Sequence, residues 1–166
     1  MTTRRRSQTQ VQEAAGDSRG MAEWIAIYQT YNAIFKLTEL ALLPHGLSLP
    51  QLHLLGVLQG GGGILTTGEI GREMVKASQT ITGLVDRLEV QNFVERQFDR
   101  RDRRKTWVRI TESGSRKLAE SMPVAARIAE ELSTVLTDKE LADLQAKIQK
   151  LREAAMERLN KALTRP

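Results

Sequence analysis

The stretch TGEIGREMVKASQTITGLVDRLEVQ, from Thr67 to Gln91, contains two short helical patterns with a three-residue turn between them. Ile70 and Met74 form the apolar face of the first pattern, and the second has an apolar stripe at three- and four-residue spacing. That stripe consists of Ile81, Leu84, Val85 and Leu88. The arrangement predicts a helix-turn-helix. An ordinary helical hairpin would show the same spacing, and the turn here lacks a glycine.

Residues that cap helix N-termini mark where these helices begin. Thr66 followed by Glu69 predicts a capping box before the first helix, and Ser78 is expected to cap the second. The same capping-box spacing occurs at two other places, Ser48 with Gln51 and Thr137 with Glu140.

The polar side of the second helix differs from an ordinary solvated face. Its N-terminal half offers small hydroxyl and amide side chains, which suit base edges and phosphates in a major groove. A solvated face of that length would more often carry Lys and Glu. We therefore expect this helix to recognise DNA. The candidate DNA-binding residues on it are Ser78, Gln79, Thr80, Thr82 and Arg87.

Two short β-like runs follow, FVERQF and TWVRIT, on either side of DRRDRRK. Val108 and Ile110 alternate with their neighbours as in a half-buried strand. A β-hairpin directly after a recognition helix is the wing of a winged helix, and arginines at its tip can enter a minor groove. The alternative is a plain solvated loop. The candidate wing residues are Arg100, Arg101, Asp102, Arg103, Arg104 and Lys105.

The excess of the net charge of +5 lies in this hairpin segment and in a tail. Residues 1–20 carry +2, residues 21–94 carry −2, residues 95–111 carry +4, residues 112–163 are neutral, and Arg165 adds the last +1. Asp99 and Asp102 relieve the repulsion between the arginines and can hold one of them by bidentate pairing. Such a localised basic segment predicts a polyanionic partner.

The segment LTTGEIGREMVKASQTITGLVDRLEVQNFVERQFDRRDRRKTWVRITESG resembles the MarR family of bacterial transcription regulators. The resemblance is carried by the two-helix unit, by LVDRLE and VER, and by the wing pattern Asp-x-Arg-Asp-x-Arg with a following Thr-Glu-x-Gly. It covers residues 66–114 closely. It implies a mainly α fold with a small β-hairpin wing, that is, a winged helix-turn-helix plus N- and C-terminal dimerisation helices. Asp102 and Arg104 fall at the family's wing-tip pair.

The same resemblance implies a homodimer that binds a palindromic operator, and a repressor released by a small aromatic or anionic effector. Three positions depart from the family pattern. Gly71 stands in place of alanine, Asn92 in place of glycine, and Gly83 where many members have a longer polar or basic side chain. The last departure puts the usual groove contact at this position in doubt.

An aromatic group on the first helix is a candidate effector pocket together with a histidine on the second. Its residues are Trp24, Tyr28, Tyr31 and His53. Core packing at helical spacing is the alternative for each of them.

The segments divide the chain into three expected parts. Residues 1–20 form a flexible basic arm, residues 21–46 and 112–166 form a helical dimerisation region, and residues 47–111 form the DNA-binding domain. Pro123 is expected to kink or restart the first C-terminal helix. The last helix has a near-heptad apolar seam, for which intramolecular packing is the alternative to dimerisation.

Composition excludes several other classes. The chain has no cysteine and only two histidines, so we expect no disulfide, no metal site and no cofactor. Glu69 stands where a phosphate-binding loop needs lysine, and no catalytic triad is available, so we expect no enzyme. No apolar run approaches the ~18 residues of a membrane span. We expect a cytoplasmic, nucleoid-associated protein of a bacterial or archaeal cell.

Two other functional classes are compatible with the sequence. One is a winged helix used for contact with RNA or another protein, without specific DNA binding. The other is a structural dimeric adaptor, in which removal of wing charge would change little.

Overall fold

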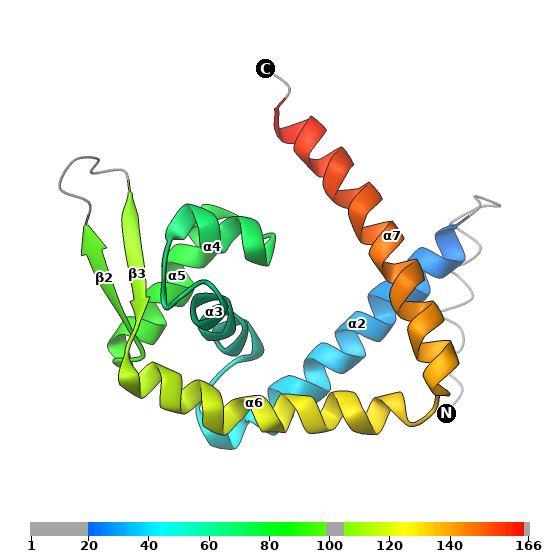
Figure 1. Cartoon of the computed structure of the whole chain (residues 1–166), viewed down its shortest axis with the longest axis horizontal. Helices are drawn as coiled ribbons and strands as arrows, with labels where there is room; N and C mark the ends of the chain where they lie inside the picture. Colours follow the sequence, from blue (N-terminus) through cyan, green and yellow to red (C-terminus); the bar gives the residue numbers. More distant parts are fainter. Residues whose placement is uncertain (1–19, 99–104, 165–166) are drawn as a thin grey trace, which may run out of the picture. The chain divides into compact units, whose positions relative to one another are not determined.

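Two short helices, α4 (Thr67–Met74) and α5 (Ser78–Val90), meet at a three-residue turn and confirm the helix-turn-helix prediction. The computed structural model describes residues 20–98 and 105–164 (Figure 1). The chain forms two compact units, residues 1–125 and 126–166, which divide within helix α6. The remaining elements are α2 (Met21–Leu42), the 3-10 turn η1 (Leu43–His45), α3 (Leu49–Gly60), β1 (Ile64–Thr66), β2 (Val94–Phe98), β3 (Thr106–Ile110), α6 (Glu112–Ser133) and α7 (Asp138–Leu163).

Helices α3, α4 and α5 of the first unit pack around one apolar core. Leucines of α3 form its centre, and Val94 and Val108 close it from the sheet. The predicted apolar stripe of α5 lies wholly inside this core. The opposite side of α5 is therefore left at the surface, which is what a recognition helix requires.

The predicted hairpin is present as the antiparallel pair β2–β3, with Phe98 opposite Thr106 at its open end. A third strand, β1, which the sequence analysis missed, pairs with the other edge of β3. Its three residues are too few to show the alternation that identifies a strand. Its place is fixed by a non-local bond, because Ile110 donates its N–H to the carbonyl of Gly63 at 2.9 Å.

All three predicted capping boxes are present, at Ser48, Thr66 and Thr137. The expectation that Ser78 caps α5 is wrong. Ala77 is the N-cap, in extended conformation, and its carbonyl accepts the N–H groups of both Thr80 and Ile81. The α5 N-terminus thus has no side-chain cap.

The turns on either side of α5 use left-handed backbone without glycine. Val75 ends α4 with φ 51° and ψ 49°, and Asn92 follows α5 with φ 58°. Asn tolerates this conformation, whereas it is strained for a β-branched residue such as valine. At Val75 the chain reverses direction between α4 and α5 within three residues, so the strain is stored in the turn that sets the angle of the recognition helix.

The junction between β3 and α6 holds the wing strands against the helices. Thr111 donates its N–H to the carbonyl of Phe93 at 3.0 Å and its hydroxyl to the carbonyl of Asn92 at 2.7 Å. The same hydroxyl accepts the N–H of Gly114 at 3.0 Å, as a helix cap does. A Cβ on Gly114 would lie 2.0 Å from the Phe93 carbonyl oxygen. The Thr-Glu-x-Gly motif thus lies where the start of α6 passes close to the backbone of Phe93, at the base of the wing.

The long helices outside the helix-turn-helix bury few residues within their own units. Helix α6 runs continuously through Pro123, so the proline does not restart the helix. No residue of α7 is buried, and only Thr38 and Leu42 of α2 are. Among the described residues, no single helix is long and apolar enough to cross a membrane. One pair of helices, Met21–His45 and Leu49–Gly60, passes the same test of length and composition when taken together, and this pair is bent by 81°.

We predict that Gly114→Ala lowers the free energy of unfolding by about 2–3 kcal/mol, because the added methyl group forces two backbone segments apart. Urea unfolding followed by circular dichroism measures this. Gly56→Ala is the matched control, since a Cβ there meets only the Met122 side chain at 3.7 Å. The control should match or slightly exceed the wild type. Equal stability of Gly114→Ala and the wild type would show that the two backbone segments do not pass close to each other.

Candidate nucleic-acid interface

The five recognition-helix candidates all lie on the exposed side of α5. Ser78, Gln79, Thr80, Thr82 and Arg87 are exposed. Thr82 donates its hydroxyl to the Ser78 carbonyl at 3.1 Å, which leaves its oxygen free to accept. The helix therefore presents a surface of amide, hydroxyl and guanidinium groups over an apolar base.

Arg96, on β2, fixes the wing to this helix, and the sequence analysis did not identify it. Its guanidinium donates to Glu89 at 2.8 Å, to the carboxylate of Asp86, and to the backbone carbonyl of Thr82 at 3.2 Å. Its own N–H bonds the second Glu89 oxygen at 3.1 Å. The side chain is only 19% exposed. One arginine thus ties three turns of α5 to the first wing strand.

A signal for Arg96 was present in the sequence. Strand alternation places it on the same side as buried Val94, so a charged side chain points toward the helices and requires acidic partners. The acids of LVDRLE, Asp86 and Glu89, are those partners. The VER and LVDRLE motifs are therefore two halves of one contact.

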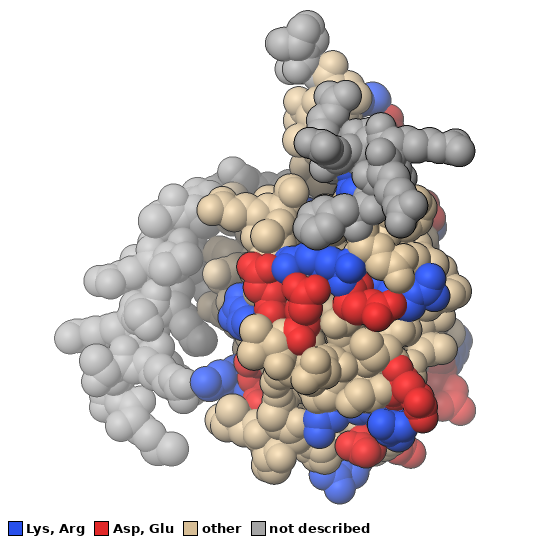
Figure 2. Space-filling model, turned by 90° about the vertical axis from the view of Figure 1, so that its left-hand side faces the viewer, with Lys and Arg blue, Asp and Glu red and all other residues tan. Residues whose placement is uncertain are grey.

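The opposite side of the hairpin carries a weaker pair. Glu95 and Arg109 face each other across β2 and β3, with 3.4 Å between Arg109 Nε and the carboxylate. Both are about half exposed. Figure 2 shows the molecule from the side on which β2 lies in Figure 1, where acidic and basic side chains lie next to one another. The described residues, 20–98 and 105–164, carry no net charge, so the positive excess of the sequence lies in residues 1–19, 99–104 and 165–166.

The wing-tip candidates fall largely outside the described residues. These are Arg100, Arg101, Asp102, Arg103 and Arg104. Lys105 is described and exposed, just before β3. The pairing of Phe98 with Thr106 brings the two ends of the tip segment together, as the hairpin prediction required.

The helix α4 that supports α5 begins at a charged cap. Thr66 donates both its hydroxyl and its N–H to Glu69, each at 2.7 Å, and these bonds lower the pKa of the carboxyl below its usual value. Arg72 and Lys105 lower it further. Since the folded-state pKa is depressed, this contribution to stability is present above the ordinary pKa of glutamate and is lost as pH falls.

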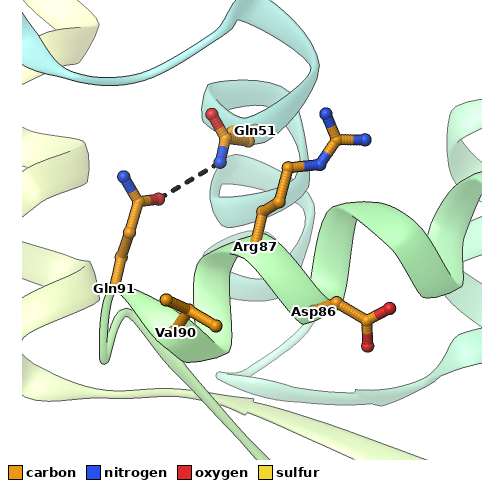
Figure 3. Close-up of a pocket in the computed structure, with 5 residues that line it drawn as sticks. All are labelled: Gln51, Asp86, Arg87, Val90 and Gln91. Carbon is orange, nitrogen blue, oxygen red and sulfur yellow. Dashed lines mark hydrogen bonds between the residues drawn. The ribbon is translucent and has the colours of Figure 1, made fainter.

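A shallow cavity of about 360 Å³ lies where the C-terminal half of α5 meets the start of α3 (Figure 3). Gln51 donates to Gln91 at 3.1 Å, and Gln91 donates to the Gly46 carbonyl at 3.1 Å. Val90, 84% exposed, and Arg87 complete the lining with Asp86. The amide pair joins the end of the recognition helix to the turn before α3.

The four effector-pocket candidates lie elsewhere on the first unit. Trp24, Tyr28 and Tyr31 are exposed along α2, and Tyr31 packs against Phe35 with ring centres 5.8 Å apart. His53 is exposed on α3. None of them lines the cavity described above. Over the described parts of the chain, no three acidic or histidine side chains are placed to hold a metal ion.

The chain is similar in sequence and in fold to known proteins. The family model described as "MarR family" matches residues 45–105. The HTH-type transcriptional regulator MhqR of Bacillus subtilis is 30% identical over 118 residues, covering 71% of this chain and 81% of MhqR. The organohalide-sensing regulator RdhR bound to 2,4-dichlorophenol has a TM-score of 0.78 at 19% identity, covering 86% of this chain and 84% of RdhR. A mutant of MarR from E. coli in complex with operator DNA has a TM-score of 0.73 at 21% identity, covering 79% and 94%. At these identities the structural matches show the fold.

We predict that Arg96→Ala lowers the free energy of unfolding by about 2 kcal/mol, because three acceptors on α5 lose a charged donor. Arg96→Lys should recover little of this loss, since a single ammonium cannot reach all three. Denaturant unfolding gives both values. Arg109→Ala, which breaks the exposed pair on the other side of the hairpin, is the control and should change stability by less than about 0.5 kcal/mol. Equal losses at positions 96 and 109 would contradict the assignment.

Proposed function

This chain belongs to the MarR family of transcriptional regulators, and from that membership we propose that it binds a double-stranded DNA operator through α5 and the β2–β3 wing. The observation that carries the proposal is the exposed polar side of α5, fixed by Arg96 to an antiparallel hairpin with a strongly basic tip. Because the family consists of regulators rather than enzymes, we propose no catalytic role. We place the protein in the cytoplasm of a bacterial or archaeal cell, at the nucleoid.

Base contacts in the major groove are proposed for Gln79, Thr80 and Thr82. A phosphate contact is proposed at the α5 N-terminus. Since Ala77 supplies no side-chain cap, the first N–H groups of the helix, at Ser78 and Gln79, are available to an anion. The wing arginines would contact phosphates, with Arg104 entering the minor groove.

Exposed apolar side chains support a homodimer. On α2 of the first unit, Trp24, Ile27, Tyr28 and Tyr31 are exposed with Ile34, Leu37 and Leu40. On α7 of the second unit, Leu144, Ile148, Leu151 and Leu159 are exposed. Apolar faces of this kind mark protein interfaces. We therefore propose residues 21–46 and 112–166 as the dimerisation region, residues 47–111 as the DNA-binding domain, and residues 1–20 as a basic arm, of which residues 1–19 lie outside the described ranges.

A two-fold dimer would present two recognition helices to one side of the DNA. Such helices enter successive major grooves, about 34 Å apart. The proposed operator is accordingly a palindrome whose half-sites are separated by one helical turn.

We predict that Arg104→Ala weakens binding to a duplex from the gene's own upstream region at least ~10-fold and reduces the slope of log affinity against log salt by about 1. Fluorescence anisotropy across a salt series measures both quantities, with a scrambled duplex alongside. Arg152→Ala, which removes the same charge from α7, is the matched control and should bind as the wild type does.

The possible outcomes separate the functional classes. Preference for the native duplex together with a loss at Arg104 supports the operator-binding regulator. Equal, weak and salt-sensitive binding to both duplexes would favour a winged helix that contacts RNA or protein. Binding that does not respond to loss of wing charge would favour a dimeric adaptor.

A repressor function controlled by a small aromatic or anionic effector is the finer part of the proposal. The aromatic side chains of Trp24, Tyr28 and Tyr31, with His53, offer stacking and a polar partner. The related fold of RdhR binds 2,4-dichlorophenol.

We predict that at least one compound among a panel of phenols and aromatic acids, at ~100-fold excess over its Kd, raises the Tm by about 5–10 °C. The same compound should weaken operator binding if the protein is a repressor. Tyr28→Ala should reduce the shift. A panel that moves neither the melting temperature nor the DNA affinity would remove the effector hypothesis.

A further inference from the structure

We infer that Arg87 reads a guanine in each half-site, and that Gly83 is the residue that makes this possible. The inference rests on the proposed DNA-binding function and assigns one specificity-determining contact within it. It turns on the position where the sequence departs from its family, since Gly83 has no side chain with which to enter the groove.

The Arg87 side chain runs back along its own helix to this vacant position. Its Nε donates to the Gly83 carbonyl at 2.9 Å. A Cβ built on Gly83 would lie 3.7 Å from Nη2 of Arg87, so the guanidinium rests against the bare backbone there. The Arg87 guanidinium therefore lies beside Gly83, one helical turn toward the N-terminus of α5 from the Cα atom of Arg87.

The guanidinium remains available for a ligand. Its acidic neighbours on the helix, Asp86 and Glu89, both bind Arg96 instead. Figure 3 shows the Asp86 carboxylate directed away from the Arg87 guanidinium. In the part of the chain that the structure describes, the bond to Gly83 is the one hydrogen bond of this side chain. The two Nη groups are left as a planar fork of four N–H donors.

A fork of this kind at this place suits a guanine edge. Two parallel N–H groups match the O6 and N7 acceptors that guanine presents in the major groove. Gln79, Gly83 and Arg87 follow one another at four-residue spacing, so the fork lies on the same side of α5 as the amide and hydroxyl groups proposed to read bases. The Nε bond fixes the orientation of the fork before binding, which reduces the entropy that the contact costs.

The missing side chain at position 83 contributes a second effect. Without a Cβ the helix backbone can come closer to the base edges. A longer residue there would occupy the groove itself and displace the guanidinium. With glycine at position 83, Arg87 contacts the base that a long side chain at position 83 would otherwise approach. The operator sequence should therefore differ from the operators of family members that have a long side chain there.

The test is a binding-site selection from a randomised duplex library with the full-length chain. The wild type should enrich half-sites with guanine at one position that Arg87→Ala leaves degenerate, with at least a ~10-fold loss of preference there and little change elsewhere. Arg87→Lys should keep only part of the guanine preference, because an ammonium can still donate to O6 and N7 but lacks the planar fork. Gly83→Gln should lose the guanine preference as well, because its long side chain would occupy the position where the Arg87 guanidinium rests.

A modified base tests the contact itself. Replacing the selected guanine by 7-deazaguanine removes N7, and should weaken the wild type severalfold without weakening Arg87→Ala further. If Arg87→Ala enriches the same guanine and shows only lower affinity with a smaller salt slope, Arg87 binds a phosphate and the inference is overturned. If the wild type enriches no sequence, the DNA-reading function itself fails. Thermal melting of each variant confirms that it is folded.

Discussion

The interface depends on one side chain, the Arg96 guanidinium between β2 and α5. It binds Asp86, Glu89 and the Thr82 carbonyl, so it holds the recognition helix and the wing strand in one orientation. Because the side chain is mostly buried, its charge is stabilised only when these acceptors are in place. In the proposed DNA complex a helix and a hairpin enter different grooves at once, and this contact holds the two in one orientation.

The same contact determines which charges are left for a ligand. Asp86 and Glu89 could otherwise pair with Arg87 on the exposed side of α5, but both bind Arg96 instead. Arg87 then binds only its own helix at Gly83 and keeps its fork of donors. The uncapped start of α5 adds N–H groups at the other end of the same surface. The acids of α5 are thus held in a structural ion pair, while Arg87 keeps donors for a ligand.

Local sequence signals predicted most of the fold. Capping boxes at Ser48, Thr66 and Thr137, the apolar stripe of α5 and the alternation of β3 are all confirmed, since each depends on residues within a few positions. The features that were missed depend on partners from other elements. β1 is a strand because it pairs with β3. Arg96 holds the wing because it binds Glu89 and Asp86, which lie seven and ten residues earlier, on α5. Ser78 was misassigned because the carbonyl of Ala77 accepts the first N–H groups of α5, so the helix starts one residue earlier than the hydroxyl side chain predicted.

In the proposed complex, two copies of this chain place two α5 helices and two wings on one face of a DNA duplex. Hydroxyl-radical footprinting on a duplex enriched by the wild-type chain tests this arrangement most directly. We expect symmetric protection of the DNA backbone centred on a palindrome, in two regions about one helical turn apart, with outer protections that disappear with Arg104→Ala. A single protected half-site, or protections at another spacing, would contradict it.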